Sequence, residues 1–176
     1  LGDVYKRQPA TYDPARDHVV MLTGRATTSS ETWLWDGLRW NRAAQSPVPP
    51  RDAHAQTYDA GRQRVVLFGG RDVVELDDTW EWDGSSWAQI FTPSTPTGRA
   101  GAAMAYDAAR GNIVLFAGAD GMFRDDTWTY DGTTWSSVPL ELRPGERLWH
   151  GMAYDPLRQR VVLYGGRDSM GPLDDT

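Results

Sequence analysis

Short apolar runs recur along the chain at a nearly constant interval. The runs span residues 19–22, 65–68, 113–116 and 161–164. A run this short, rich in Val, Ile and Leu, predicts a strand that is buried on both of its faces. A Tyr-Asp pair precedes every run, and successive pairs are 46, 48 and 48 residues apart: Tyr12-Asp13, Tyr58-Asp59, Tyr106-Asp107 and Tyr154-Asp155. This spacing indicates an internal repeat.

Each repeat predicts four short strands, as the second repeat illustrates. We expect its strands at 53–58, 64–68, 79–83 and from 87 onwards. In the third of them Trp80 and Trp82 share one face, and Asp83-Gly84 supplies the positive φ of a tight hairpin turn. No stretch shows helical periodicity. A sheet with two apolar faces must bury both against neighbouring sheets, and radial stacking of such sheets gives a β-propeller.

Tryptophan and glycine recur at fixed places within the repeat. One Trp follows Thr in the third strand and another starts the fourth strand, which gives the set Trp33, Trp40, Trp80, Trp87, Trp128 and Trp135. Each buried Trp removes roughly 150–250 Å² of surface from water, so we expect this set to carry the packing between sheets. Glycines follow each apolar run, and they are Gly24, Gly69, Gly70, Gly118, Gly165 and Gly166.

The two positions that follow each apolar run differ in how strictly they are glycine. The second is Gly in every repeat, whereas the first is Thr23 in one repeat and Ala117 in another. We therefore expect the second Gly to hold a backbone conformation that other residues avoid. The first position should have an ordinary conformation.

These residues resemble the kelch-repeat family. The resemblance is carried by the double Gly that ends the second strand and by the paired aromatic residues downstream, as in Gly69-Gly70, Trp82 and Trp87. It covers residues 9–176. It implies an all-β fold, a β-propeller of four-stranded antiparallel blades like the central domain of bacterial galactose oxidase-type proteins. The expected blades are 9–50, 51–98, 99–146 and, as the first half of a fourth, 147–176.

Two expectations concern the ends of the chain. Kelch propellers close with about six or seven blades, so the resemblance implies an incomplete propeller that forms an open arc. At the start, Tyr5 stands where the other repeats begin with Arg, and Lys6 is the one lysine in the chain. We expect residues 1–8 to be a non-native, adapter-derived segment that lies outside the fold.

Composition narrows the class of protein. Hydrophobic residues make up 40% and charged residues 24% of the 176 residues, as in an ordinary globular domain. The formal net charge of −6 argues against nucleic acid or an anionic membrane as the main partner. No apolar run is long enough for a transmembrane helix. The absence of cysteine excludes disulfides, thiol nucleophiles and cysteine-linked cofactors.

The use of arginine in place of lysine, with abundant Ala and Gly, is typical of a high-GC bacterial genome. Together with the absence of cysteine, it leads us to expect a bacterial protein that is secreted or held at the cell surface. This expectation does not depend on a signal peptide.

Arginines are the first candidates for ligand binding. In the resemblance the first strand of each blade is innermost, so Arg51, Arg99 and Arg147 would ring a central pocket. They would lie on the rim formed by the loops that enter the first strand and leave the second, where Arg71 and Arg167 also lie. Arg suits carboxylate recognition because its fork binds bidentately. The alternative is a structural Arg that pairs with the Asp of a neighbouring blade.

Histidines and paired carboxylates are the other candidates. His54 and His150 follow the opening Arg by three residues and would point near the inner channel, but no third ligand for a metal is evident. Asp77-Asp78, Asp125-Asp126 and Asp174-Asp175 could bind calcium or act as acid and base. A pair that recurs in every blade favours a structural role, with Asp78, Asp126 and Asp175 receiving backbone or Arg donors. We assign no metal, cofactor or catalytic residue.

The leading functional hypothesis is a non-catalytic propeller module that binds protein or glycan through this rim. The main alternative is a fragment of a propeller enzyme, galactose oxidase-like or glycan-active, whose catalytic residues lie in the missing blades. Galactose oxidase-like chemistry needs a Cys-crosslinked Tyr that this stretch lacks, and the adjacent Asp83-Gly84 does not match the sialidase Asp-box. A third hypothesis is a structural repeat wall in a larger surface protein. The fold alone does not discriminate between these three hypotheses. Besides a ligand, we expect the remaining blades of the same propeller as partners, but no nucleic acid and no membrane insertion.

Overall fold

The structure is a computed structural model that describes residues 8–24, 29–43 and 46–176. Within these ranges the fold is all-β, with four antiparallel sheets and no helix, hence no helix that could span a membrane. Residues 1–7 of the segment expected to be non-native lie outside the described residues. Gln8 is described, and its Nε2 donates to the carbonyl oxygen of Arg51 at 3.3 Å.

Each sheet follows the chain order, and the strands have the following bounds. Sheet 1 contains β1 (Ala10–Asp13), β2 (His18–Thr23), β3 (Glu31–Trp35) and β4 (Trp40–Arg42). Sheet 2 contains β5 (Ala55–Asp59), β6 (Arg64–Phe68), β7 (Thr79–Trp82) and β8 (Trp87–Ile90). Sheet 3 contains β9 (Ala103–Asp107), β10 (Asn112–Phe116), β11 (Thr127–Tyr130) and β12 (Trp135–Val138). Sheet 4 contains β13 (Gly151–Asp155) and β14 (Arg160–Tyr164).

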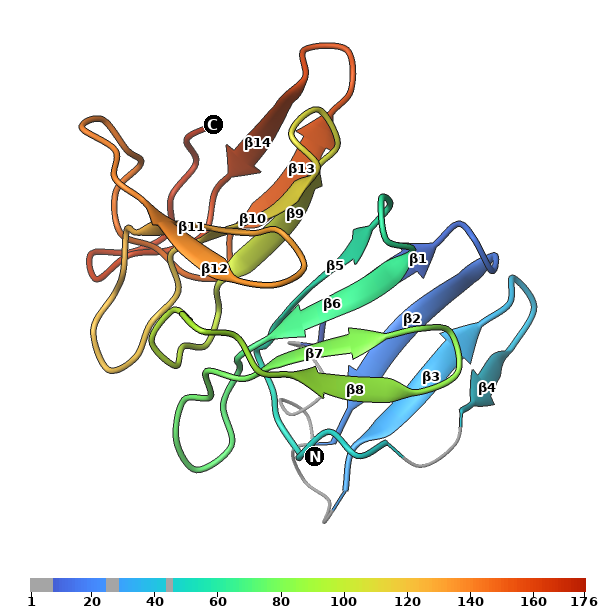
Figure 1. The fold of residues 1–176 in the computed structure, drawn as a ribbon. Coiled ribbons are helices and arrows are strands. Elements are labelled where there is room, and N and C mark those ends of the chain that lie inside the picture. The colour runs from blue at the N-terminus through green and yellow to red at the C-terminus, as the bar shows by residue number, and fades with distance from the viewer. Residues whose placement is uncertain (1–7, 25–28, 44–45) are drawn as a thin grey trace.

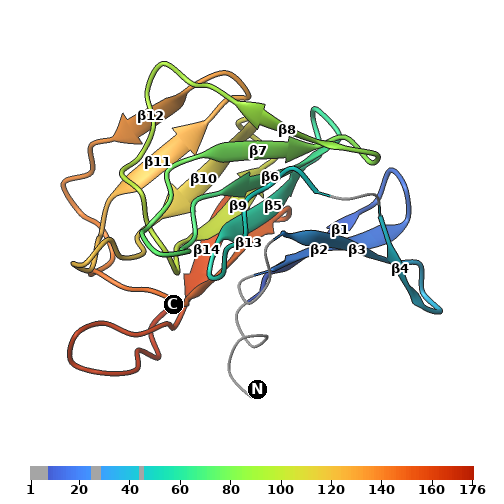
Figure 2. The ribbon, with the colours of Figure 1, turned by 90° about the horizontal axis from the view of Figure 1, so that it is seen from below.

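The sheets fan out from their first strands. The contacts between neighbouring sheets run from β1 to β5, from β5 to β9 and from β9 to β13. The fourth strands β4, β8 and β12 lie at the outer edges (Figures 1 and 2). The repeat in the sequence therefore corresponds to one sheet per repeat, with the same strand order in sheets 1 to 3.

Strand β6 shows why four consecutive apolar residues form a central strand. Its side chains alternate, so Val65 and Leu67 join a core shared with sheet 1, whereas Val66 and Phe68 join a core shared with sheet 3. All four side chains are buried. The burial on both faces that the apolar run predicts is confirmed for this strand.

Tryptophan ties neighbouring sheets together through hydrogen bonds as well as packing. The indole Nε1 of Trp87 in sheet 2 donates to Thr32 Oγ1 in sheet 1 at 2.9 Å. The indole Nε1 of Trp135 in sheet 3 donates to Thr79 Oγ1 in sheet 2, also at 2.9 Å. All four side chains are buried. Each bond therefore satisfies a polar group that would otherwise be desolvated between two sheets.

The glycine prediction is confirmed at the second position and is wrong for Ala117 at the first, whereas Thr23 is not among the residues with positive φ. Gly70, Gly118 and Gly166 have φ of 97°, 94° and 98°, and Gly24 has φ of 148°. A Cβ on Gly70 would meet Asp52 O at 2.7 Å and His54 Cβ at 2.9 Å, so close approach adds to the conformational requirement. Ala117, which we expected to be ordinary, has a left-handed φ of 58°.

Sheet 4 differs from the others in the part of the chain that the structure describes. Strand β14 pairs with β13 alone, and its apolar residues are partly exposed, with Tyr164 61% exposed. The corresponding Phe68 and Phe116 are buried at 1% and 3% exposure. The open arc stays a prediction, because neither closure nor incompleteness follows from these contacts.

Candidate functional site

The three arginines that open the repeats lie inside the protein. The side chains of Arg51, Arg99 and Arg147 are 0%, 1% and 2% exposed. Each guanidinium group makes a bidentate pair with one carboxylate, with Nη2–Oδ2 distances of 2.8–2.9 Å to Asp78, Asp126 and Asp175. Each Nη1 also donates to a main-chain carbonyl at 3.0–3.1 Å, namely that of Gly69, Ala117 or Gly165.

This placement corrects our expectation that Arg51, Arg99 and Arg147 ring a ligand pocket. Burying a guanidinium requires that its donors be matched, and Arg51 satisfies them with Asp78, Gly69 O and Pro49 O. The alternative of a pair with a neighbouring blade also differs from the structure, because Asp78 belongs to the same repeat as Arg51. The pair fastens the loop after the second strand to the segment before the first strand.

The carboxylates of these pairs are held ionised. Burial opposes ionisation of Asp78, but the hydrogen bonds and charge of Arg51 and the indole N–H of Trp80 outweigh it, so the pKa of Asp78 lies below its ordinary value. The pKa of Asp126 is lowered in the same way by Arg99 and Trp128. These contacts are those of a structural group that repeats in sheets 2, 3 and 4.

The two candidate histidines are buried close to these arginines. Burial, together with the positive charge of Arg51, lowers the pKa of His54 to about 3. Burial and Arg147 lower the pKa of His150 to about 4. Both imidazoles are therefore neutral near pH 7. Within the described ranges no three His, Asp or Glu side chains form a group that could hold a metal ion.

Arg71 and Arg167 lie on the rim, in the loops that leave the second strands β6 and β14, and they are exposed. Arg71 Nε is 3.6 Å from Glu75 Oε1, and the Arg71 side chain is 52% exposed. The guanidinium carbon of Arg167 lies 5.9 Å from the ring centre of Trp149. Arg71 lines a pocket on this rim, whereas Arg167 is outside its lining.

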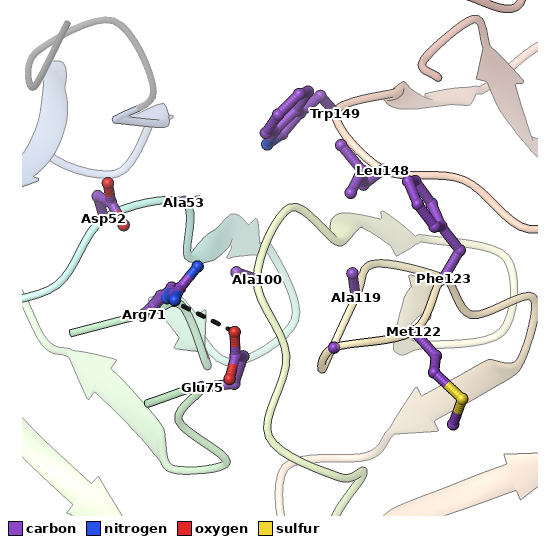
Figure 3. A pocket seen from close by; sticks show the side chains of 11 residues that line it. Asp52, Ala53, Arg71, Glu75, Ala100, Ala119, Met122, Phe123, Leu148 and Trp149 are labelled. Carbon is purple, nitrogen blue, oxygen red and sulfur yellow. Dashed lines mark ion pairs between the residues drawn. The ribbon is translucent and has the colours of Figure 1, made fainter. Parts of the chain in front are cut away.

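The rim pocket has a volume of about 450 Å³ and is built from three sheets (Figure 3). Two small residues of the lining, Ala100 before β9 and Ala119 after β10, lie between the two walls. One wall comes from the loops of sheet 2 and carries charged side chains: Asp52, Arg71 and Glu75. The opposite wall is apolar and comes from sheet 3 and from the segment before β13: Met122, Phe123, Leu148 and Trp149.

Main-chain hydrogen bonds hold the segments that line the pocket. Asp52 and Arg71 exchange both N–H···O bonds at 2.9 Å, and the pairs Ala100–Ala119 and Leu148–Arg167 repeat this bridge in the next two sheets. Between sheets, Gly101 N donates to Ala53 O and Trp149 N donates to Gly101 O, each at 2.8 Å. The backbone around the pocket is therefore fixed from sheet 2 to the segment before β13.

The same three positions also share an unusual backbone conformation. Ala53, Gly101 and Trp149 have left-handed φ values of 52°, 71° and 59°. A non-glycine residue in this region is strained, and the inter-sheet hydrogen bonds hold Ala53 and Trp149 there. This conformation sets the direction in which the large Trp149 side chain leaves the chain, beside the pocket.

Our sequence analysis found Arg71 but missed the rest of the pocket lining. A signal existed, since Trp149 is the ninth tryptophan and stands outside the repeated set. The positions that line the pocket also change from repeat to repeat, as in Asp52, Ala100 and Leu148. Recurrence in the sequence therefore does not point to the pocket, because most of its lining differs between repeats; Arg71, which returns as Arg167, is the exception.

Comparison with known proteins gives one partial similarity. No protein-family model matches the chain. A stretch of 76 residues is 37% identical to part of dynein regulatory complex subunit 7 from Chlamydomonas reinhardtii. The match covers 40% of this chain and 6% of the length of that protein.

Proposed function

We propose that this chain is part of a kelch-type β-propeller and acts as a non-catalytic binding module. In this proposal the four sheets are blades arranged around their first strands, and the rim pocket holds a protein or glycan ligand. Support for the architecture comes from the repeated four-stranded sheets, from the contacts between successive first strands and from the Trp–Thr bonds between sheets. This architecture offers loops of one rim to a ligand.

The observation that carries the binding role is the break in the repeat at the pocket. The residues that stabilise the sheets are the same in successive repeats, as with Arg51–Asp78 and Arg99–Asp126. Along the pocket, equivalent positions carry Asp52, Ala100 and Leu148. Residues that stabilise the fold are expected to be the same at matching positions of every repeat. In this proposal, the positions that differ between repeats are those that recognise a ligand.

The exposed apolar residues of the pocket also fit a binding role. Met122 is 64% exposed and Trp149 is 44% exposed on the same rim. Large apolar side chains gathered at one exposed place mark interaction sites, and Trp is among the residues that contribute most to binding energy. The backbone strain at Trp149 is consistent with a side chain held in place for contact.

The test is to screen the chain against peptide and glycan arrays and then to substitute one apolar residue of the pocket. We expect Trp149→Ala to weaken binding of the selected ligand by about tenfold or more. Leu157→Ala is the matched control, because Leu157 is 91% exposed in the turn between β13 and β14, away from the pocket. Binding that survives Trp149→Ala, or no binding to either array, would contradict the proposal.

A further inference from the structure

We propose that the ligand of the rim pocket is a basic peptide segment, in which a Lys or Arg side chain lies beside a large apolar one. This inference rests on the proposed binding function and narrows it to one ligand chemistry. The basic side chain would pair with Glu75 and lie near Asp52, and the apolar side chain would pack against Met122, Phe123 and Trp149.

The two walls of the pocket are chemically opposite, which favours a ligand with two kinds of side chain. The sheet 2 wall carries two carboxylates, Asp52 and Glu75, and one guanidinium, Arg71 (Figure 3). The facing wall is apolar and combines the buried Leu148 and the half-buried Phe123 with the exposed Met122 and Trp149. A peptide presents a cationic and an apolar group a few ångströms apart, as this arrangement requires.

The charge of the rim segments in sheets 2 to 4 points to a cationic ligand. In sheets 2 to 4 the segments on the pocket rim are 51–54, 70–78, 99–102, 118–126, 147–150 and 166–175. They contain eleven Asp and Glu residues against six Arg. The turns on the opposite rim are 59–64, 83–86, 107–112, 131–134 and 155–160, with five Asp against five Arg. The buried histidines of the pocket rim are neutral near pH 7. The acidic excess therefore lies on the rim that carries the pocket, where it attracts cations.

The pair between Arg71 and Glu75 is weak enough for a ligand to compete. Its single close approach is 3.6 Å, which is longer than a hydrogen bond, and the side chain of Arg71 is half exposed. Arg51, by contrast, is buried and makes a bidentate pair with Asp78. A carboxylate accepts several donors, so Glu75 can bind an incoming Lys or Arg while Arg71 moves into solvent.

The first experiment uses three fluorescein-labelled decapeptide pools and measures binding to the full chain by fluorescence anisotropy. In the basic pool Arg or Lys alternates with Leu or Phe; the second pool has Glu, and the third has Gln, at the charged positions. We expect the basic pool to bind at least about tenfold more tightly than the Glu pool. Raising the NaCl concentration from about 50 to 500 mM should weaken the binding of the basic pool, because salt screens exposed charges.

The second experiment uses variants whose effects have opposite signs. Glu75→Gln should weaken binding of the basic pool by about 3- to 10-fold, whereas Arg71→Gln should strengthen it by about threefold because it removes the internal competitor. Asp77→Asn is the control for charge, since it makes the same change on the same loop outside the pocket lining. It should alter binding less than about twofold. Thermal melts check that all three variants remain folded.

The outcomes separate this inference from the function on which it rests. Stronger binding of the Glu or Gln pool, weaker binding by Arg71→Gln, or an oligosaccharide that binds in a Trp149-dependent manner overturns the basic-peptide inference and leaves the binding function standing. If no pool and no oligosaccharide binds, or if binding is unchanged by Trp149→Ala, both the basic-peptide inference and the proposed binding function are overturned.

Discussion

Arg51 and Arg71 lie in the same repeat, and the sequence suggested a ligand role for both, yet the structure places them in opposite environments. Arg51 is buried and bonded to Asp78 and to main-chain carbonyls. Arg71 is half exposed on the rim and approaches Glu75 at 3.6 Å. Arg51 recurs as Arg99 and Arg147 in the next repeats, whereas Arg71 is replaced by Ala119 in the third repeat and returns as Arg167 in the fourth.

In the proposed binding module, residues that recur in each repeat form the structural framework, and residues that depart from the repeat form the surface that would meet a ligand. Framework residues should control folding stability, and pocket residues should control binding with little effect on stability. Four changes, from the largest expected effect to the smallest, test or sharpen this division.

Replacing the framework arginine should have the largest effect. Arg51→Met leaves the mostly buried carboxylate of Asp78 without its partner, which should cost about 3–5 kcal/mol of unfolding free energy. Arg71→Gln should change stability by less than about 0.5 kcal/mol, because Arg71 is exposed and weakly paired. Urea denaturation of the two variants measures both values, and similar losses would remove the distinction between framework and rim.

The framework histidines should make stability depend on pH. The pKa values of His54 and His150 are lowered to about 3 and about 4, so their contribution is present above pH 6.5 and is lost as the pH falls toward those values. At pH 5 the loss is about 2 kcal/mol for each histidine.

The substitutions His54→Ala and His150→Ala together should flatten the stability curve between pH 7 and 5, and Ala102 shows that this position accepts Ala. Urea midpoints measured across this range in wild type and in the double variant supply the comparison. A wild-type curve that is already flat would contradict the burial of neutral imidazoles.

The bond between sheets 2 and 3 should have an intermediate effect. Thr79→Val keeps the shape of the side chain but leaves the buried indole N–H of Trp135 without its acceptor, which should cost about 1–3 kcal/mol. Thr127→Val is the matched control in β11, where the side chain is only partly buried. Chemical denaturation should show a clearly smaller loss for the control, and equal losses would mean that the Trp135 bond is not the cause.

The smallest effect should come from a glycine restored to the framework. Ala117 holds a left-handed φ of 58°, where Gly69 and Gly165 stand in the neighbouring repeats. Ala117→Gly relieves this strain but increases the freedom of the unfolded chain, so we expect a net gain of about 0.5 kcal/mol. A thermal melt of the variant should rise slightly, and a fall would show that the Ala117 conformation carries no strain.

The sequence predicted the framework better than the site. The apolar runs, the Trp positions and the Asp-Gly turns led to the strands observed in sheets 1 to 3, because periodicity reports burial directly. The wrong conformation at Ala117 arose because we took the presence of Ala as a sign of ordinary φ. The direction of Arg51 could not be read from spacing, because only the partners 18 and 27 residues away, Gly69 and Asp78, decide whether it turns inward.

The main-chain bridges at the pocket have an evolutionary consequence. Asp52 and Arg71 are joined by a pair of main-chain hydrogen bonds, as are Ala100 with Ala119 and Leu148 with Arg167. Charged and large apolar side chains can therefore replace one another at these positions, while the main-chain hydrogen bonds that shape the rim persist. Under the proposed binding function, single substitutions at these positions can change ligand specificity without an unstable intermediate. The same property makes positions 52, 71, 100, 119 and 148 a natural set for randomisation when a new ligand is to be selected.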